Sequence, residues 1–236
     1  MAHSDKRAMR VALGIPFWGD DPDRNRAYWA TYDVITNLFP FDEVIQLPPG
    51  LSGRGASRNY IAQEAHQRGC DVVVICDADT IPEPKGLRDA IYGAHTLGGQ
   101  HFPYDSFRYL SEYGTALWYD NRQEAFDHCE MEGPGSYGGV FAMRPEEYWA
   151  AGGFPQLEGW GFEDIIFVVQ TRTLIRDAVW HPGSITHLWH PSAVSVGSES
   201  YCRNLAICQK FEAVDRNPDA LKALMIMGVG MHVRTW

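Results

Sequence analysis

The chain has 236 residues, of which 45% are hydrophobic and 21% charged, so it can bury one sizeable core. Its formal net charge of −10 disfavours nucleic acid and other polyanions as partners. No apolar stretch approaches the roughly 18 residues that a membrane-spanning helix needs, and the N-terminal segment 1–10 is polar. We therefore expect one soluble, cytoplasmic domain.

The five cysteines form neither a Cys-x-x-Cys pair nor a regular spacing pattern. Because their number is odd and their positions are scattered, we expect free thiols in a reducing compartment. The same scatter argues against a structural zinc site.

Strand-like and helix-like segments alternate in the first part of the chain. Short apolar runs predict strands at 11–15, 43–47 and 72–75. Between them, the helical spacing of apolar residues predicts helices at 25–38 and 56–67. This alternation is typical of a Rossmann-like α/β fold, in which helices flank a central mixed, mostly parallel sheet.

The second part of the chain is richer in aromatic residues and glycine. We expect a short helix at 85–93 and strand-like aromatic segments between 101 and 119. A strand at 140–143 precedes a helix that begins around Pro145, because proline is well tolerated in the first helical turn. A helix at about 200–214 and a shorter one after it end the predicted elements.

Two aspartates follow the most apolar of the predicted strands. Asp77 and Asp79 come directly after the run 72–76, and alternation along a strand would point both side chains the same way. In open α/β sheets, ligands bind outside the carboxyl ends of the strands. The pair therefore predicts a metal and phosphate site, although a short Asp-x-Asp is also common in solvated turns and helix caps.

A second acidic pair follows a glycine-rich segment. Glu163 and Asp164 come after Trp160 and Gly161 and precede the apolar run 165–169, which predicts a helix. The position at a helix N-terminus allows a simple interpretation, in which the two carboxylates only cap the helix and complement its dipole. The flanking tryptophan and glycines favour a functional site instead.

Five motifs in fixed order resemble those of the GT-A glycosyltransferases, most closely the family 2 enzymes and the β-1,4-galactosyltransferase group. They are Pro16 after the first strand, Ala56-Ser57-Arg58-Asn59, Asp77-Ala78-Asp79, Gly152-Gly153-Phe154 and Trp160-Gly161-Phe162-Glu163-Asp164. The likeness spans about 11–191, and five ordered motifs are much more specific than one. It implies a single-domain GT-A fold.

The resemblance also implies roles on the donor side. Asp77 would contact the ribose or the sugar of a nucleotide sugar, and Asp79 would bind the Mn²⁺ or Mg²⁺ ion that bridges the donor diphosphate. Pro16 with the loop after it, and Arg58, would help to hold the nucleotide.

On the acceptor side, the resemblance assigns the catalytic base to the second acidic pair. We take Asp164 as the base and Glu163 as the residue that holds the acceptor or donor sugar, and we expect Trp160 to stack on the acceptor. This chain has Phe162 where the galactosyltransferase group usually has glycine, and Ile165-Ile166 where that group has further acids. The identity of the acceptor therefore does not carry over.

The family often supplies a late histidine as a third metal ligand. His190 is our choice, because it precedes a proline as the family's histidine usually does. His187 lies three residues earlier and would face the opposite side if the segment were a strand. His181 is a weaker candidate.

Together, these observations predict a metal-dependent glycosyltransferase, most simply a hexosyltransferase. It would move a sugar from a nucleotide sugar, expected to be UDP-linked, to an acceptor hydroxyl with inversion. We expect a nucleotide-sugar half at about 10–100, an acceptor half at about 101–200 and a C-terminal helical segment at 201–236. Two alternatives remain: a nucleotidyltransferase, for which Gly53-Arg54-Gly55 is a thin phosphate-binding loop, and a noncatalytic carbohydrate-binding protein.

Overall fold

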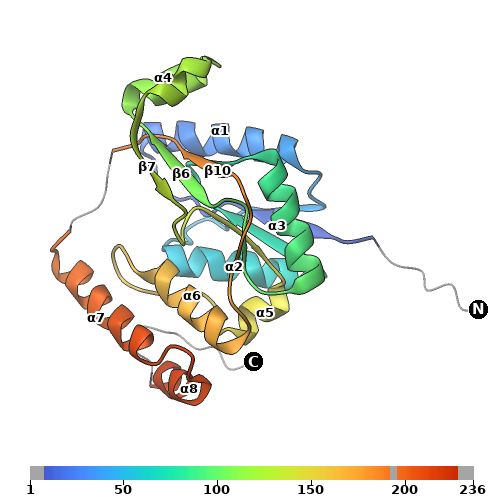
Figure 1. The fold of residues 1–236 in the computed structure, drawn as a ribbon, viewed down its shortest axis with the longest axis vertical. Coiled ribbons are helices and arrows are strands. Elements are labelled where there is room, and N and C mark those ends of the chain that lie inside the picture. The colour runs from blue at the N-terminus through green and yellow to red at the C-terminus, as the bar shows by residue number, and fades with distance from the viewer. Residues whose placement is uncertain (1–7, 192–195, 228–236) are drawn as a thin grey trace, which may run out of the picture.

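The structure of the chain, a computed structural model, describes residues 8–191 and 196–227 (Figure 1). Its main sheet has six strands in the order β2-β1-β3-β8-β5-β9. Their bounds are β1 Val11–Gly14, β2 Glu43–Ile45, β3 Val72–Cys76, β5 His101–Phe102, β8 Val140–Met143 and β9 Val179–Trp180. Only β8 runs antiparallel to its neighbours, β3 and β5. The predicted α/β fold with a mixed, mostly parallel sheet is confirmed.

The order of the first three strands creates a crevice at the carboxyl ends of the strands, between β1 and β3. Helix α1 (Pro22–Leu38) connects β1 to β2 across one face of the sheet. Helix α2 (Arg54–Gln67) returns the chain to β3 across the other face. Because such crossovers are right-handed, the two helices cover opposite faces, as Figure 1 shows. Ligands bind outside the strand ends at such a switch point. Pro16 follows β1 there, and Asp77 follows β3.

A second, four-stranded sheet was not predicted from the sequence. Its order is β4-β10-β6-β7, with β4 at Thr80–Pro82, β6 at Ser106–Leu110, β7 at Cys129–Pro134 and β10 at Ser184–His187. Strand β4 starts immediately after Asp79 and pairs antiparallel with β10, so that His187 lies opposite Thr80. This pairing brings the late histidine segment to the first aspartate pair.

The expectation of strand-like structure throughout 101–119 is wrong at its end. The residues after β6 form helix α4 (Glu112–Tyr119), which projects at the end of the β6–β7 hairpin in Figure 1. Ser111 caps this helix by accepting a hydrogen bond from the backbone N–H of Gly114. The aromatic residues that suggested a strand have only a weak β preference, which a helix cap and packing override.

Several predicted helices begin earlier or end later than expected, α2 among them. Helix α1 begins at Pro22 because Asp21 caps it and proline suits the first turn. Helix α3 (Pro84–Leu97) continues past 93 to Gly98, whose φ of 70° ends it. The remaining helices are the 3-10 helix Gln123–Asp127, α5 (Pro145–Ala150), α6 (Glu163–Leu174), α7 (Glu199–Ala213) and α8 (Pro218–Ile226).

The C-terminal helices pack against α6 rather than against the main sheet. Their shared core is formed by Ile166, Val169, Cys208, Phe211, Leu221 and Met225. Helices α7 and α8 lie in the C-terminal part of the chain, and 228–236 lie outside the described residues. The five cysteines are free, as expected.

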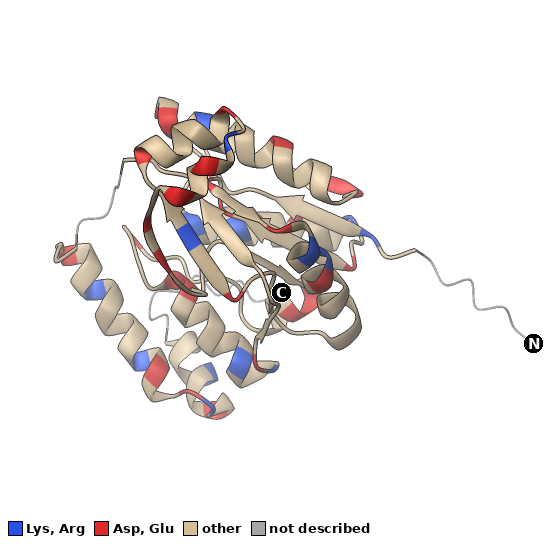
Figure 2. Ribbon diagram, turned by 45° about the horizontal axis from the view of Figure 1, so that its top comes forward, with Lys and Arg blue, Asp and Glu red and all other residues tan. Residues whose placement is uncertain are grey.

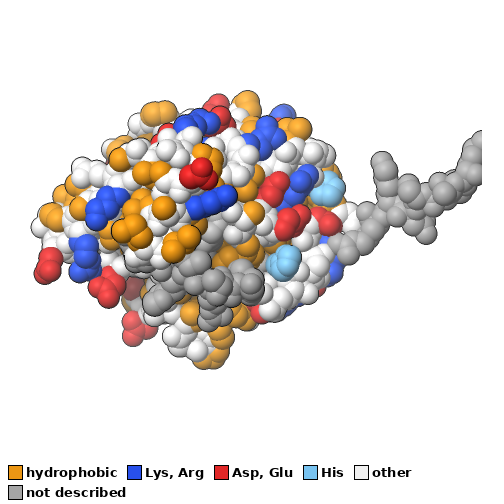
Figure 3. All heavy atoms as spheres, turned by 90° about the horizontal axis from the view of Figure 1, so that it is seen from below, with side chains coloured by type: hydrophobic (Ala, Val, Ile, Leu, Met, Phe, Trp, Pro, Cys, Tyr) orange, Lys and Arg blue, Asp and Glu red, His pale blue; other side chains and the backbone are white. Residues whose placement is uncertain are grey.

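Charges on the described surface are mixed in sign. Along α7, two basic residues lie between acidic residues near its ends (Figure 2), and the face in Figure 3 carries small patches of hydrophobic side chains between charged residues. Neither view shows the basic stripe that a nucleic-acid partner would require. Within the described ranges, no helix is both long and apolar enough to cross a bilayer.

Candidate active site

A cavity of about 800 Å³ lies outside the carboxyl ends of β1 and β3. It is lined by the loop after β1, the turn after β3, the glycine-rich loop before β8, the start of α6 and the end of β10. Its charged and titratable lining residues are Arg24, Arg54, Arg58, Asp77, Asp79, Tyr109, Glu130, Tyr137, Glu163, Asp164, His187, His190 and Tyr201. Pro16 and Trp160 line it as well, so the cavity contains every residue that the sequence assigned to the site, whereas the weaker candidate His181 lies against His101 instead.

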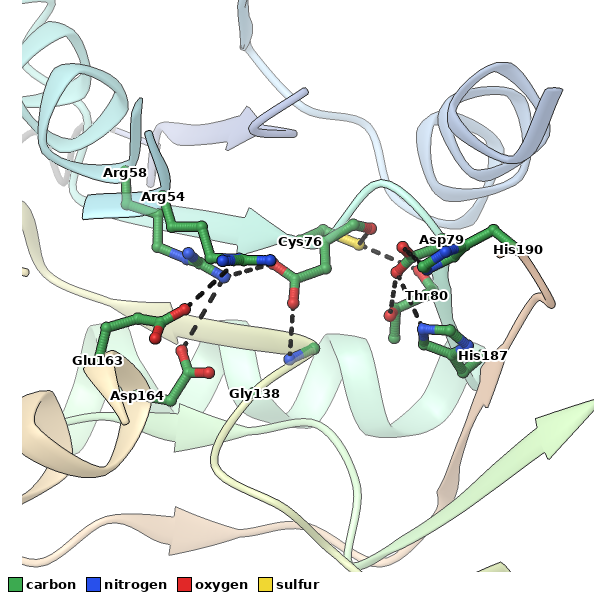
Figure 4. Close-up of polar contacts among 12 residues, drawn as sticks. Arg54, Arg58, Cys76, Asp79, Thr80, Gly138, Glu163, Asp164, His187 and His190 are labelled. Carbon is green, nitrogen blue, oxygen red and sulfur yellow. Dashed lines mark hydrogen bonds and ion pairs between the residues drawn. The ribbon is translucent and has the colours of Figure 1, made fainter. Parts of the chain in front are cut away.

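Asp79 forms one cluster with two histidines (Figure 4). Its carboxylate lies 3.0 Å from His190 Nε2 and 3.5 Å from His187 Nε2. One ligand atom from each of the three residues can be chosen so that all lie within 4.8 Å of one another. Since a single ion needs its ligand atoms within this range, the cluster has the geometry of a metal site.

Neighbouring groups fix the orientation of both imidazoles. His190 Nδ1 lies 3.0 Å from the Pro191 carbonyl oxygen, which requires a proton on Nδ1 and directs Nε2 at Asp79. His187 stacks on Tyr109, with ring centroids 4.3 Å apart. Such outer contacts are the usual way in which proteins orient metal-binding histidines.

The histidines favour the ionised form of Asp79, and Asp79 favours the protonated form of His190. Burial opposes ionisation of Asp79, but its hydrogen bond with His190 and the nearby His187 lower its pKa to about 2. The hydrogen bond to Asp79 raises the pKa of His190, whereas burial lowers that of His187. Asp79 is therefore a carboxylate throughout the physiological range, as a metal ligand must be.

Two geometric expectations about this cluster are wrong. His187 does not face away from His190, because β10 ends at His187 and the chain then turns. The backbone N–H of Leu188 donates to the carbonyl of Asp79, which ties this turn to the aspartate. Asp77 and Asp79 also contact different partners, because β3 ends at Cys76 and the alternation of a strand no longer applies.

Asp77 joins α2 to the glycine-rich loop. Its carboxylate accepts a hydrogen bond from Arg58 Nη2 at 2.6 Å and from the backbone N–H of Gly139 at 3.2 Å. Its own backbone N–H donates to the carbonyl of Gly139 at 2.6 Å. Gly139 has a φ of 86°, which favours glycine, and a Cβ there would crowd the side chains of Ile185 and Thr80.

Two arginines of α2 lie beside the second acidic pair, as Figure 4 shows. Arg58 is 4% exposed and lies 3.9 Å from Asp164, and Arg54 lies 3.5 Å from Glu163. Burial raises the pKa of Asp164 above its usual range, with further increases from Glu163 and Asp77, although Arg58 opposes the change. A carboxylate with a raised pKa in a cavity is a candidate general base.

The acidic pair does not cap helix α6. The N-cap is Phe162, and no side chain makes a capping hydrogen bond at this end. Glu163 is 6% exposed, unlike an ordinary solvated carboxylate at a helix start. The capping half of the simple interpretation therefore lacks its defining contact, whereas both acids do lie in the first turn of α6, where the helix dipole favours them.

Phe162 adopts a backbone conformation that favours glycine. Its φ is 74°, and Gly161 before it has a φ of 103°. We expect Phe162→Gly to unfold at a higher urea concentration than Phe162→Ala, with a difference in free energy of about 1 kcal/mol. Both variants lose the ring, but only glycine removes the strain. An alanine variant as stable as the glycine variant would contradict this reading.

Sequence reasoning missed several side chains that line the cavity. His187 was placed on the wrong side, and Arg24, Arg54 and Tyr201 carried no site assignment. Of these, only Arg54 lies in a short sequence motif that could have indicated a site, Gly53-Arg54-Gly55. Arg24 and Tyr201 reach the cavity from α1 and α7, whose positions depend on contacts distant in sequence.

No protein-family model matches the chain, and no curated protein matches its sequence. Its fold is similar to that of the catalytic domain of Drosophila β1,4-galactosyltransferase 7 in complex with xylobiose. The two share 16% identity over 84% of this chain and 80% of the other, with a TM-score of 0.55. Another structure of that enzyme, a mutant in complex with manganese, UDP-Gal and xylobiose, gives a TM-score of 0.54 at 16% identity over 83% and 79%.

Glucosyl-3-phosphoglycerate synthase from Mycobacterium tuberculosis also shares the fold. Its complex with Mn²⁺, UDP and glucosyl-3-phosphoglycerate has a TM-score of 0.51 and 16% identity, over 84% of this chain and 78% of that one. These structures are GT-A glycosyltransferases. The chain therefore has the GT-A fold that its sequence motifs imply.

Proposed function

We propose that the protein is a metal-dependent glycosyltransferase that moves a sugar from a UDP-sugar to an acceptor hydroxyl, with inversion. The observation that carries the proposal is that one cavity contains both the Asp79–His187–His190 cluster and the carboxylate of Asp164. The fold and the ligands named for the similar structures support it. The free cysteines support a cytoplasmic location.

The ligand atoms of Asp79, His187 and His190 suit a divalent metal ion of the first transition row. One carboxylate and two imidazoles would leave open positions for diphosphate oxygens and water. Because Mg²⁺ prefers oxygen ligands and imidazole nitrogen suits transition metals, this set favours Mn²⁺ over Mg²⁺. The ion would neutralise charge on the diphosphate leaving group.

The remaining chemistry belongs to side chains of the cavity. We assign Asp77, Arg58 and Pro16 to the nucleotide sugar, and Trp160 and Glu163 to the acceptor. Asp164 would accept the proton of the attacking hydroxyl while the new bond forms at the anomeric carbon and the bond from that carbon to the diphosphate breaks. Attack opposite the leaving group gives inversion of configuration.

The nucleotidyltransferase alternative has less support in the structure. Its candidate loop offers one cation, Arg54, which would have to be free for a triphosphate. Arg54 instead pairs with Glu163 and donates to the carbonyl of Gly159 at 3.3 Å. A triphosphate would have to break both contacts.

Calorimetric titration of UDP tests the proposed function. We expect binding in the presence of Mn²⁺, weaker binding with Mg²⁺ and little binding with EDTA. Release of pyrophosphate from a nucleoside triphosphate, without UDP binding, would instead favour the nucleotidyltransferase.

His187 gives a specific test of the metal cluster. His187→Phe keeps a ring against Tyr109 but removes the nitrogen that faces Asp79. We expect Mn²⁺ affinity to fall by about tenfold or more, since even outer contacts of metal ligands contribute about 10–100-fold. His128→Phe is the control, because His128 is exposed and packs on Tyr113 outside the cavity. Equal Mn²⁺ affinity in both variants would remove His187 from the ligand set.

A further inference from the structure

The cavity has an aromatic surface to which the C-terminal helix α7 contributes. Trp160 and Tyr201 both line the cavity, and their rings are nearly parallel, with an angle of 6° and centroids 6.1 Å apart. Phe162 packs edge-on against Tyr201 at 5.0 Å. Trp160 is 38% exposed, so part of its ring is open to a ligand.

Helix α7 also holds the loop that carries Trp160. Asn204, which is 1% exposed, donates from Nδ2 to the carbonyls of Glu158 at 3.0 Å and of Trp160 at 3.3 Å. Ser198 caps the helix by accepting a hydrogen bond from the N–H of Tyr201 at 3.3 Å. The aromatic surface is therefore fixed from both sides, by the loop before α6 and by the first turns of α7.

The arginines that lie beside the second acidic pair are already paired with carboxylates. Among the described residues, the cationic side chains that line the cavity are those of three arginines. Arg54 pairs with Glu163, and Arg58 pairs with Asp77 and lies near Asp164. Arg24, on α1, also lines the cavity, and its charge helps to lower the pKa of Asp79 in the metal cluster. An anionic acceptor would therefore meet Glu163 and Asp164 beside two arginines that are already paired.

We propose that helix α7 completes the acceptor site and that the acceptor is an uncharged sugar, whose ring packs on Trp160 and Tyr201. This inference rests on the proposed function. The apolar face of a pyranose suits an aromatic ring, and its hydroxyls can donate to Glu163 and Asp164. The two similar enzymes differ on this point, since one was solved with xylobiose and the other with glucosyl-3-phosphoglycerate. The charges of this cavity favour a neutral sugar, as xylobiose is, over a phosphorylated acceptor.

Ligand-observed NMR tests the acceptor class. The protein would be loaded with UDP and Mg²⁺, which avoids paramagnetic broadening. Methyl β-xyloside, β-glucoside and β-galactoside would then be compared with 3-phosphoglycerate. We expect saturation transfer to the ring protons of at least one neutral glycoside and none to 3-phosphoglycerate. Binding of 3-phosphoglycerate, or of neither class, would overturn the inference.

Three variants of α7 separate a direct contact from a structural effect. We expect Tyr201→Ala to weaken binding of the neutral glycoside by about fivefold or more, since single aromatic contacts of this kind are worth about 1 kcal/mol. Tyr201→Phe should retain binding, and Gln209→Ala, on the exposed face of the same helix, should not change it. Equal binding by Tyr201→Ala and Gln209→Ala would exclude Tyr201 from the site. UDP affinity is measured on every sample, and loss of UDP binding by the wild type would contradict the proposed function instead.

Discussion

Replacement of Asp79 by asparagine should abolish metal-dependent binding of UDP. Asparagine keeps the size of the side chain but removes the charge that pairs with His190 and His187. We expect UDP affinity in the presence of Mn²⁺ to fall by about 100-fold or more, because a direct ligand contributes at least as much as its outer contacts. Calorimetric titration of UDP with Mn²⁺ measures the change.

A matched variant controls for the loss of one negative charge. Asp120 is exposed at the end of α4 and lies outside the cavity. Asp120→Asn should bind UDP as the wild type does. Circular dichroism of Asp79→Asn establishes that the variant is folded. A folded Asp79→Asn protein with wild-type UDP affinity would show that the ion does not bind at this cluster.

Replacement of Asp164 by asparagine should separate catalysis from donor binding. A base acts on the proton of the acceptor, so the rate of sugar transfer, or of donor hydrolysis by water, should fall by about 10²–10⁴-fold. UDP affinity should change little, because the metal cluster and Asp77 remain. Asp219→Asn is the control, since Asp219 occupies the first turn of α8 as Asp164 occupies that of α6, without facing the cavity.

Glu163→Gln distinguishes the roles of the two acids. Glu163 is buried and pairs with Arg54. Because we assign Glu163 to acceptor binding, loss of its negative charge should raise the acceptor KM more than it lowers kcat. A normal rate in Asp164→Asn together with an inactive Glu163→Gln protein would exchange the two assignments. Normal rates in both variants would make the acidic pair structural.

The sequence predicts the elements that carry the site better than the contacts between them. The apolar run of β3 ends at Cys76, and its burial follows directly from its composition. Asp77 and Asp79 could therefore be placed at a strand end. Their divergent contacts could not, because they depend on the turn that connects β3 to β4.

The place of His187 shows why the metal cluster was only partly predictable. The alternation of strand side chains separates His187 from His190 only while the strand continues. Strand β10 ends at His187, and its pairing with β4 joins residues about a hundred positions apart in the sequence. No local pattern reports such a pairing. The contribution of Tyr201 depends in the same way on the packing of α7 against α6.

The most direct test of the account is diphosphate release from a panel of nucleotide sugars, measured with and without Mn²⁺. We expect release of UDP from at least one UDP-sugar with Mn²⁺, slowly with water alone as acceptor, and almost none with EDTA. Release that is equally fast with EDTA, or no release from any donor by a folded protein that contains Mn²⁺, would contradict a metal-dependent glycosyltransferase.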